Sequence, residues 1–251
     1  MDIQPLLSHL DQELKPGLFK DYGPNGLQVE GKKEIHKVVT GVTANLSLIQ
    51  KAIEKKADLI LVHHGIFWKH RASTIQGVQY QRIKSLMSFD INLVAYHLPL
   101  DAHPHMGNNA QLAKLLGLKI EKSFDLDGQP GLGMVGRLSK PKASDEFASF
   151  LEKTLGHTPL YTKGNLETIQ TIGWCTGGAE SYLETFQALG VDAYLTGEYS
   201  LAAIEYAKES GIAFFAAGHH ATERYGIQAL GEHLKKKFDL DVEYIDIPNP
   251  A

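Results

Sequence analysis

The sequence is poor in cysteine, in surplus charge of one sign and in long apolar runs. Its 251 residues include a single cysteine, Cys175, which excludes an internal disulfide framework. Lys and Arg number 25 against 29 Asp and Glu, so the net charge of −4 makes nucleic-acid binding unlikely. No run approaches the roughly 18 apolar residues needed to span a bilayer. The sequence therefore predicts neither a membrane nor a nucleic-acid partner.

The first residues also lack the basic start and the apolar core of a signal peptide. We therefore expect a cytoplasmic protein. In that reducing environment the 12 histidines are available as metal ligands. With 43% hydrophobic residues, the chain can bury a substantial core without disulfides.

Short β-rich runs alternate with amphipathic stretches, and the order strand, helix, strand, helix, strand occurs twice. The strands are expected at residues 35–42, 59–62, 91–96, 169–175, 191–195 and 212–217, and the helices between them at 46–56, 80–89, 182–189 and 201–208. Further elements are expected at 134–138, 146–155, near Leu160 and at 242–247. The sequence predicts an α/β protein with two similar, interlinked halves and mainly parallel sheets, divided into residues 1–125 and 126–251.

The two copies carry short motifs at matching points of their predicted strands and helices, which suggests a diverged duplication. The pair His63-His64 aligns with Gly197-Glu198, and His97-x-x-x-Asp101 aligns with His219-x-x-x-Glu223. The connection over residues 65–79 is longer in the first copy. Because parallel α/β sheets bind ligands beyond the carboxyl ends of their strands, it is a candidate substrate loop. The alternative is a surface loop whose Trp68 packs back on the body of the protein.

Candidate metal ligands follow three of the predicted strands. Each His-x-x-x-acid motif pairs a nitrogen donor with an anionic oxygen donor, and a further strand ends at two adjacent histidines. Imidazole and carboxylate bind borderline divalent ions such as Zn, Fe or Mn, and a carboxylate can bridge two ions. We therefore predict two divalent metal ions at the carboxyl ends of the strands, between the halves, with candidate ligands among His63, His64, His97, Asp101, His219 and Glu223.

Each candidate also has a purely structural interpretation. His97 could be a core histidine bonded to a backbone carbonyl, and Asp101 or Glu223 could stabilise a helix start. Glu198 could orient a ligand or cap a helix. The joint occurrence of the motifs at strand ends favours metal binding over these separate explanations. Cys175 lies inside an apolar run, which favours a buried structural thiol.

The motifs together resemble those of the NGG-interacting-factor-like dinuclear metal-centre proteins, a family commonly labelled GTP cyclohydrolase type 2-like. The segments that carry the resemblance are Asn25-Gly26-Leu27-Gln28-Val29, Val62-His63-His64-Gly65, Ala95-Tyr96-His97-x-x-x-Asp101, Leu195-Thr196-Gly197-Glu198 and Gly218-His219-His220-x-Thr222-Glu223. The resemblance implies metal ligation by His63, His64, Asp101, His219 and Glu223, with a bridging carboxylate. It also implies a toroidal homo-hexamer. His97 is then a further ligand or a catalytic base beside the ions.

Paired divalent ions lower the pKa of water and polarise the bond under attack, which favours hydrolysis of a nucleotide-like anionic substrate. His97 or His220 could move protons. The sequence does not choose between a purine ring, a phosphoester and an amide as the bond that is cleaved. Two alternatives stay open: a non-catalytic metal-binding regulator, metal carrier or scaffold, and a ring that clamps nucleic acid.

Overall fold

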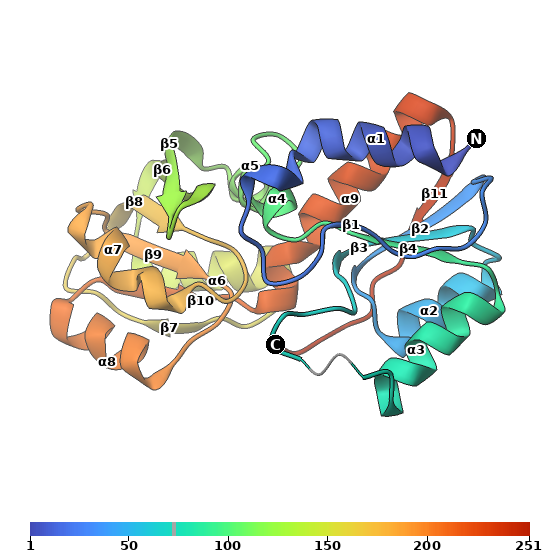
Figure 1. The fold of residues 1–251 in the computed structure, drawn as a ribbon. Coiled ribbons are helices and arrows are strands. Elements are labelled where there is room, and N and C mark those ends of the chain that lie inside the picture. Colours follow the sequence, from blue (N-terminus) through green and yellow to red (C-terminus); the bar gives the residue numbers. More distant parts are fainter. Residues whose placement is uncertain (72–73) are drawn as a thin grey trace. The chain divides into compact units, whose positions relative to one another are not determined.

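The computed structural model describes residues 1–71 and 74–251, which form two compact units (Figure 1). Unit 1 consists of Met1–Leu100 and Gly226–Ile247, and unit 2 consists of Asp101–Tyr225 and Pro248–Ala251. This division differs from the predicted one at residue 125, because the chain enters unit 2 at Asp101 and later returns to unit 1. Ala72 and Ser73 of the candidate substrate loop lie outside the described residues.

Unit 1 is built on a five-stranded sheet in the order β1-β4-β3-β2-β11. The strands are β1 (Gly26–Val29), β2 (Lys37–Thr43), β3 (Leu59–His64), β4 (Asn92–Ala95) and β11 (Asp241–Tyr244). All neighbours are parallel except β1 and β4. Helices α2 (Leu46–Glu54) and α3 (Gly77–Ser88) cover one face. Helix α1 (Ile3–Leu14) and the C-terminal part of α9 (His219–Phe238) cover the other (Figure 1).

Local sequence explains how α2 begins and which side it buries. The side chain of Asn45 caps its first turn by accepting from the backbone N–H of Leu48. Leu48, Ile49 and Ala52 then face the sheet at helical spacing and are buried. They pack against strand residues such as Ile60 in a core that α3 also contacts. The polar face of α2 is left to solvent.

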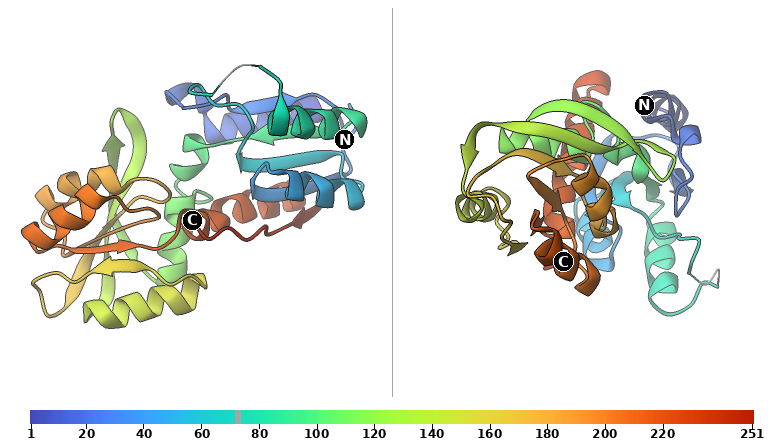
Figure 2. Two further views of the ribbon diagram at one scale, coloured as in Figure 1. Left: turned by 90° about the horizontal axis from the view of Figure 1, so that it is seen from below. Right: turned by 90° about the vertical axis from the view of Figure 1, so that its left-hand side faces the viewer.

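Unit 2 has a six-stranded mixed sheet in the order β5-β6-β8-β9-β10-β7. The strands are β5 (Lys119–Leu126), β6 (Gln129–Lys142), β7 (Leu160–Thr162), β8 (Ile169–Trp174), β9 (Ala193–Thr196) and β10 (Ala213–Ala216). The central strands β8, β9 and β10 are parallel, and antiparallel strands extend the sheet on both sides. The β5–β6 hairpin is seen in green in Figure 2.

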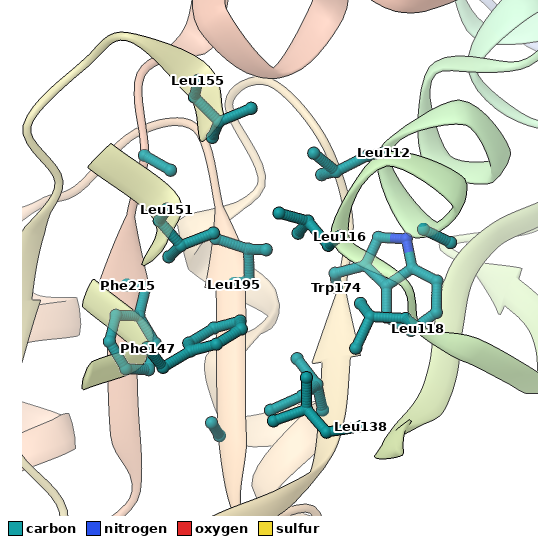
Figure 3. Packing of buried hydrophobic residues seen from close by; sticks show 14 of the residues in the cluster. Leu112, Leu116, Leu118, Leu138, Phe147, Leu151, Leu155, Trp174, Leu195 and Phe215 are labelled. Carbon is teal, nitrogen blue, oxygen red and sulfur yellow. The ribbon is translucent and has the colours of Figure 1, made fainter. Parts of the chain in front are cut away.

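Helices α5 (Asn108–Leu116) and α6 (Ser144–Leu155) pack their apolar sides on one face of the unit 2 sheet. The other helices of this unit are α7 (Leu183–Ala188) and α8 (Leu201–Ser210), and α4 (Leu98–Asp101) leads into it. Short 3-10 turns occur at Pro16–Leu18 and Glu180–Tyr182. Phe147 meets Phe215 edge to face at 5.1 Å, in the same buried cluster as Trp174 (Figure 3). These aromatic contacts fix α6 on the sheet.

Each predicted strand and helix of the two copies is present, and the predicted α/β fold is confirmed. One contact repeats in both units. The side chain of Asp58, just before β3, accepts two backbone N–H groups at the start of β2, at 2.9 and 3.0 Å. Asp192, just before β9, accepts two at the start of β8, at 2.9 and 2.7 Å. Among the described residues, no helix is long and apolar enough to cross a bilayer.

Candidate metal centre

Two neighbouring strands of unit 1 bring three histidines to the same edge of the sheet. β3 ends with His63 and His64, and His97 follows β4. The ring centroids of His63 and His64 lie 4.5 Å apart, and the ring of His97 lies 5.1 and 5.4 Å from them. Each ring offers a nitrogen within 4.8 Å of a nitrogen of the other two. The sequence-predicted donors of unit 1 are therefore gathered in one place.

The rings of His63 and His64 are both held through Nδ1. Nδ1 of His63 lies 3.0 Å from the carbonyl oxygen of Tyr96, and Nδ1 of His64 lies 3.1 Å from Oγ1 of Thr43. Because a carbonyl oxygen can only accept, neutral His63 carries its proton on Nδ1 and its lone pair on Nε2. Metal-binding histidines are commonly oriented in this way, with one nitrogen bonded to the protein and the other to the ion.

His97 is held by a carboxylate that the sequence analysis missed, Asp21. Nδ1 of His97 lies 2.7 Å from Oδ1 of Asp21, and Oδ2 of Asp21 accepts from the backbone N–H of Leu98 and from Asn25. Asn25 in turn accepts from the backbone N–H of His97 at 2.8 Å. Burial raises the pKa of Asp21, but its bonds to His97 and Asn25 outweigh burial, so the pKa lies below its usual value. Asp21 therefore keeps its charge beside His97.

In unit 2 the candidate ligand Asp101 is the last residue of α4 and is only 5% exposed. Its Oδ1 accepts from Nδ2 of Asn108 at 2.8 Å and lies 3.4 Å from Oγ1 of Thr176. Hydrogen-bond donors and cations both stabilise a buried carboxylate, so Asp101 is chemically suited to bind a metal ion.

Glu223 and His219 lie one turn apart on α9, which begins at His219 rather than at the predicted position after Glu223. Nε2 of His219 is 3.0 Å from Glu223, and its Nδ1 is 2.5 Å from Glu198. Burial lowers the pKa of His219, but the two carboxylates outweigh burial and raise it to about 10. The imidazole therefore keeps a proton between them. A divalent cation would satisfy the same negative field.

The structure also bears on the two interpretations of Glu198. The cap of the following helix, α8, is Ser200, whose side chain accepts from the backbone N–H of Ala203. Glu198 instead reaches the imidazole of His219, 21 residues along the chain. The interpretation as a ligand-orienting residue fits, and the interpretation as a helix cap is wrong.

The side chains of Asp101 and Glu223 both reach the loop that follows β8. Asp101 contacts Thr176, and Glu223 lies so close to the next residue, Gly177, that a Cβ there would stand 2.1 Å from its Oε1. Gly177 also has a positive φ of 70°, which favours glycine. In the same loop Cys175 is buried, and burial together with the negative charges of Asp101 and Glu223 raises its pKa. A structural thiol is the result, as the sequence predicted.

A separate histidine pair lies in unit 1, on helices α1 and α9. Nε2 of His9 is 2.7 Å from Nε2 of His233, and Glu13 lies one turn further along α1. Burial lowers the pKa of His9, and the charge of Lys237 lowers it further. The two rings share a hydrogen bond, which satisfies them without a ligand.

Comparison with known proteins finds relatives that match this chain over its whole length. A model of the family Duf34/NIF3 (NGG1p interacting factor 3) matches residues 1–250. The GTP cyclohydrolase 1 type 2 homolog of Pasteurella multocida (strain Pm70) is 49% identical over 252 residues, covering 100% of this chain and 99% of that relative.

Two solved structures are also similar over the whole length of both chains. The protein ybgI, a structural-genomics protein of unknown function, has a TM-score of 0.96 and 47% identity. The protein TTHA1606 from Thermus thermophilus has a TM-score of 0.87 and 33% identity. The sequence resemblance to NGG-interacting-factor-like proteins is thereby confirmed, and the chain belongs to the Duf34/NIF3 (NGG1p interacting factor 3) family.

Proposed function

We propose that this protein is a dinuclear metal-dependent hydrolase that acts on a nucleotide-like anionic substrate. The residues that would hold two divalent ions, Zn, Fe or Mn, are His63, His64, Asp101, His219 and Glu223. The observation that carries the proposal is the imidazole cluster of unit 1, in which each Nδ1 has a partner inside the protein. A protein partner at one ring nitrogen is how metal-binding and proton-transferring histidines are commonly oriented.

Each unit by itself brings together donors of one kind, imidazoles in unit 1 and carboxylates in unit 2. The carboxylates Asp101 and Glu223 both contact the loop after β8. Imidazole nitrogen and carboxylate oxygen together suit borderline divalent ions, and either carboxylate is suited to bridge them.

Charge favours an anionic substrate. Two divalent ions bring four positive charges and two carboxylates return two negative ones, so an excess of about +2 is left for a substrate to neutralise. The shared name of the relatives, GTP cyclohydrolase 1 type 2 homolog, supports a nucleotide as that anion.

When bound, paired ions activate water and polarise the bond under attack. The chain supplies the proton transfer. His97 is positioned for this role because Asp21 accepts from its Nδ1 and stays negatively charged, which stabilises the imidazolium that forms when Nε2 takes a proton. Asn25 fixes the backbone of His97 and so keeps the ring in place.

The proposal includes a cytoplasmic homo-oligomer, a toroidal hexamer, as the family resemblance implies. Light scattering of the purified protein at micromolar concentration tests the assembly. A mass of one or two chains would rule out the hexamer without affecting the proposed chemistry.

The chemistry is tested with the double variant Asp101→Asn, Glu223→Gln. Both substitutions keep the shape of the side chain and remove its charge. The matched control is Glu209→Gln, which removes an exposed carboxylate from α8. Elemental analysis should find two ions per chain in the parent and in the control, and fewer than one in the double variant. Hydrolysis of GTP and other nucleoside triphosphates should follow the metal content.

Two outcomes would contradict the proposal. Absence of stoichiometric metal from carefully prepared parent protein would remove the centre itself. Full metal loading of the parent with hydrolysis no faster than in the double variant would leave a non-catalytic metal-binding regulator, carrier or scaffold.

A further inference from the structure

A cavity of about 890 Å³ lies in unit 1, between the described part of the loop after β3 and the beginning of α3. Its lining includes Trp68, Lys69, Arg71, Gln79 and Arg82, none of which is a proposed metal ligand. The volume falls in the range of pockets that enclose small organic molecules.

Trp68 connects the cavity with the histidine cluster. Its ring lies 5.9 Å from the ring of His64 and meets the ring of His97 edge to face at 5.2 Å. The same side chain lines the cavity and is partly exposed. A molecule that stacks on Trp68 would therefore lie next to the imidazoles of the proposed metal centre.

The first part of the loop is held in place by the segment before β1 and by β1 itself. The backbone N–H of Ile66 donates to Oε1 of Gln28 at 2.9 Å, and the backbone N–H of Lys69 donates to the carbonyl of Tyr22 at 2.7 Å. Gly23 allows a close approach, since a Cβ there would stand 2.4 Å from the carbonyl oxygen of Phe67. These contacts form the Trp68 side of the cavity in advance of any ligand.

The polar side of the cavity is cationic. The described lining residues include Lys69, Arg71 and Arg82 but no acidic residue. Nε of Arg82 is buried and has no hydrogen-bond acceptor among the described residues. Burial lowers the pKa of Arg82, and the positive charge of Arg71 lowers it further. Neither arginine forms an ion pair with a carboxylate in the part of the chain that the structure describes.

Such an arrangement is costly without a ligand. A buried guanidinium N–H without an acceptor loses the hydrogen bond that water would have given it, and a second guanidinium nearby adds repulsion. An anion relieves both, because the planar guanidinium donates to phosphate oxygens in a fork geometry. A planar ring on Trp68 would complete the match between the cavity and a ligand.

We propose that this cavity is the substrate-binding pocket of the centre and takes a nucleotide-like molecule, with the phosphates at Arg82 and Arg71 and the base stacked on Trp68. The inference rests on the proposed function for the reaction that follows, but binding itself requires no turnover. It gives the described residues of the candidate substrate loop, 65–71 and 74–79, a nucleotide-like ligand.

The test measures binding of GTP, guanosine and inorganic triphosphate to the full-length, metal-loaded protein by calorimetry. Arg82→Gln should weaken GTP binding at least tenfold and leave guanosine within twofold of the parent, because only the phosphate contact is removed. The matched control is Lys84→Gln, which removes one positive charge from the same helix but does not line the cavity. It should change neither affinity.

Tryptophan fluorescence gives an independent readout. GTP and guanosine should quench the partly exposed Trp68, whereas Trp174 is fully buried in unit 2 and provides a constant background. In Trp68→Phe the quenching should disappear. If Arg82→Gln does not fold, Arg71→Gln replaces it, since the side chain of Arg71 is exposed and its removal leaves no cavity in the core.

The two proposals fail in different ways. Unchanged GTP affinity in both arginine variants, or quenching that persists in Trp68→Phe, would overturn the pocket assignment even if the protein hydrolyses GTP. Arginine-dependent GTP binding in a parent protein that turns nothing over would support the pocket and reject the hydrolase.

Discussion

The two units share one βαβαβ plan but carry different chemical groups at equivalent positions. β3 of unit 1 ends in the imidazole donors His63 and His64, whereas β9 of unit 2 is followed by Gly197 and Glu198. Unit 1 thus gathers imidazoles, and unit 2 gathers carboxylates around a protonated His219. The repeated fold therefore determines the positions of the candidate functional side chains, and substitutions at these positions determine their charge.

The largest expected effect comes from two glycines, Gly41 in β2 of unit 1 and Gly177 in the loop after β8 of unit 2. Gly177→Ala should destabilise the protein by about 2–5 kcal/mol, because it combines a positive φ with a Cβ 2.1 Å from Glu223. Gly41→Ala should cost about 1–3 kcal/mol, because its Cβ meets mainly the side chain of Leu48, at 2.6 Å. Urea unfolding of both variants measures the difference.

Metal content separates the two glycines further. Gly177→Ala should lose bound metal because Glu223 must move, whereas Gly41→Ala should retain it. Equal stability and equal metal content in the two variants would show that the close approach of Gly177 to Glu223 affects neither stability nor metal binding.

The next effect concerns the carboxylates that orient a histidine in each unit. Asp21 is buried, while the side chain of Glu198 is 47% exposed. Asp21→Asn should reduce metal affinity or hydrolysis ten- to hundredfold, as expected for a buried carboxylate that holds a functional histidine. Glu198→Gln should cost less than about tenfold, because water can replace an exposed partner. Nitrogen chemical shifts of His97 should change in the first variant only.

A smaller effect is expected from the repeated aspartates. Asp58→Asn should lower stability by about 1–2 kcal/mol, since it weakens bonds to backbone N–H groups and to Lys32. Burial raises the pKa of Asp58, but Lys32 and the backbone donors outweigh burial and lower it overall. This stability is present above pH 3.8 and disappears as the pH falls through the native pKa.

Asp192→Asn provides the matched measurement in unit 2, where the same backbone bonds occur. It should cost about 1 kcal/mol or less, because these bonds come from neutral backbone donors. A larger loss in Asp192→Asn than in Asp58→Asn would reverse the expected contribution of Lys32.

The smallest effect is the pH dependence of the His9 pair. Since the native pKa of His9 lies below 6.5, the unfolded chain binds the proton first as the pH falls below 6.5. The free energy of unfolding should therefore decrease by less than about 1 kcal/mol between roughly pH 7.5 and 5.5. His9→Gln should remove that decrease. His36→Gln, at an exposed histidine of the same unit, should preserve it.

Hydrophobic periodicity was sufficient to predict both βαβαβ copies, because each element buries a face whose spacing is local. Sheet order and unit limits depend on distant pairings. The expected closing strand near residue 242 proved to be β11, yet nothing local indicates that it pairs with β2. Helix α1 and the division at residue 101 were not predicted for the same reason.

The candidate site was predictable to a similar degree. Repeated His-x-x-x-acid spacing and the adjacent histidine pair identified His63, His64 and His97, which the structure brings together. The same spacing paired His219 with Glu223, but it did not show that both lie on α9. Asp21 lies 76 residues from His97, so spacing gave no sign of their pairing. Arg82 looks like an ordinary helix residue in the sequence, and only its buried surroundings mark it.

The return of residues 226–247 to unit 1 has a consequence for biosynthesis. Most of this unit leaves the ribosome first, but one edge of β2 stays unpaired until β11 has emerged, when nearly the whole polypeptide has been made. An open strand edge during translation invites wrong pairing with other nascent chains. The sheet that starts first is thus completed last.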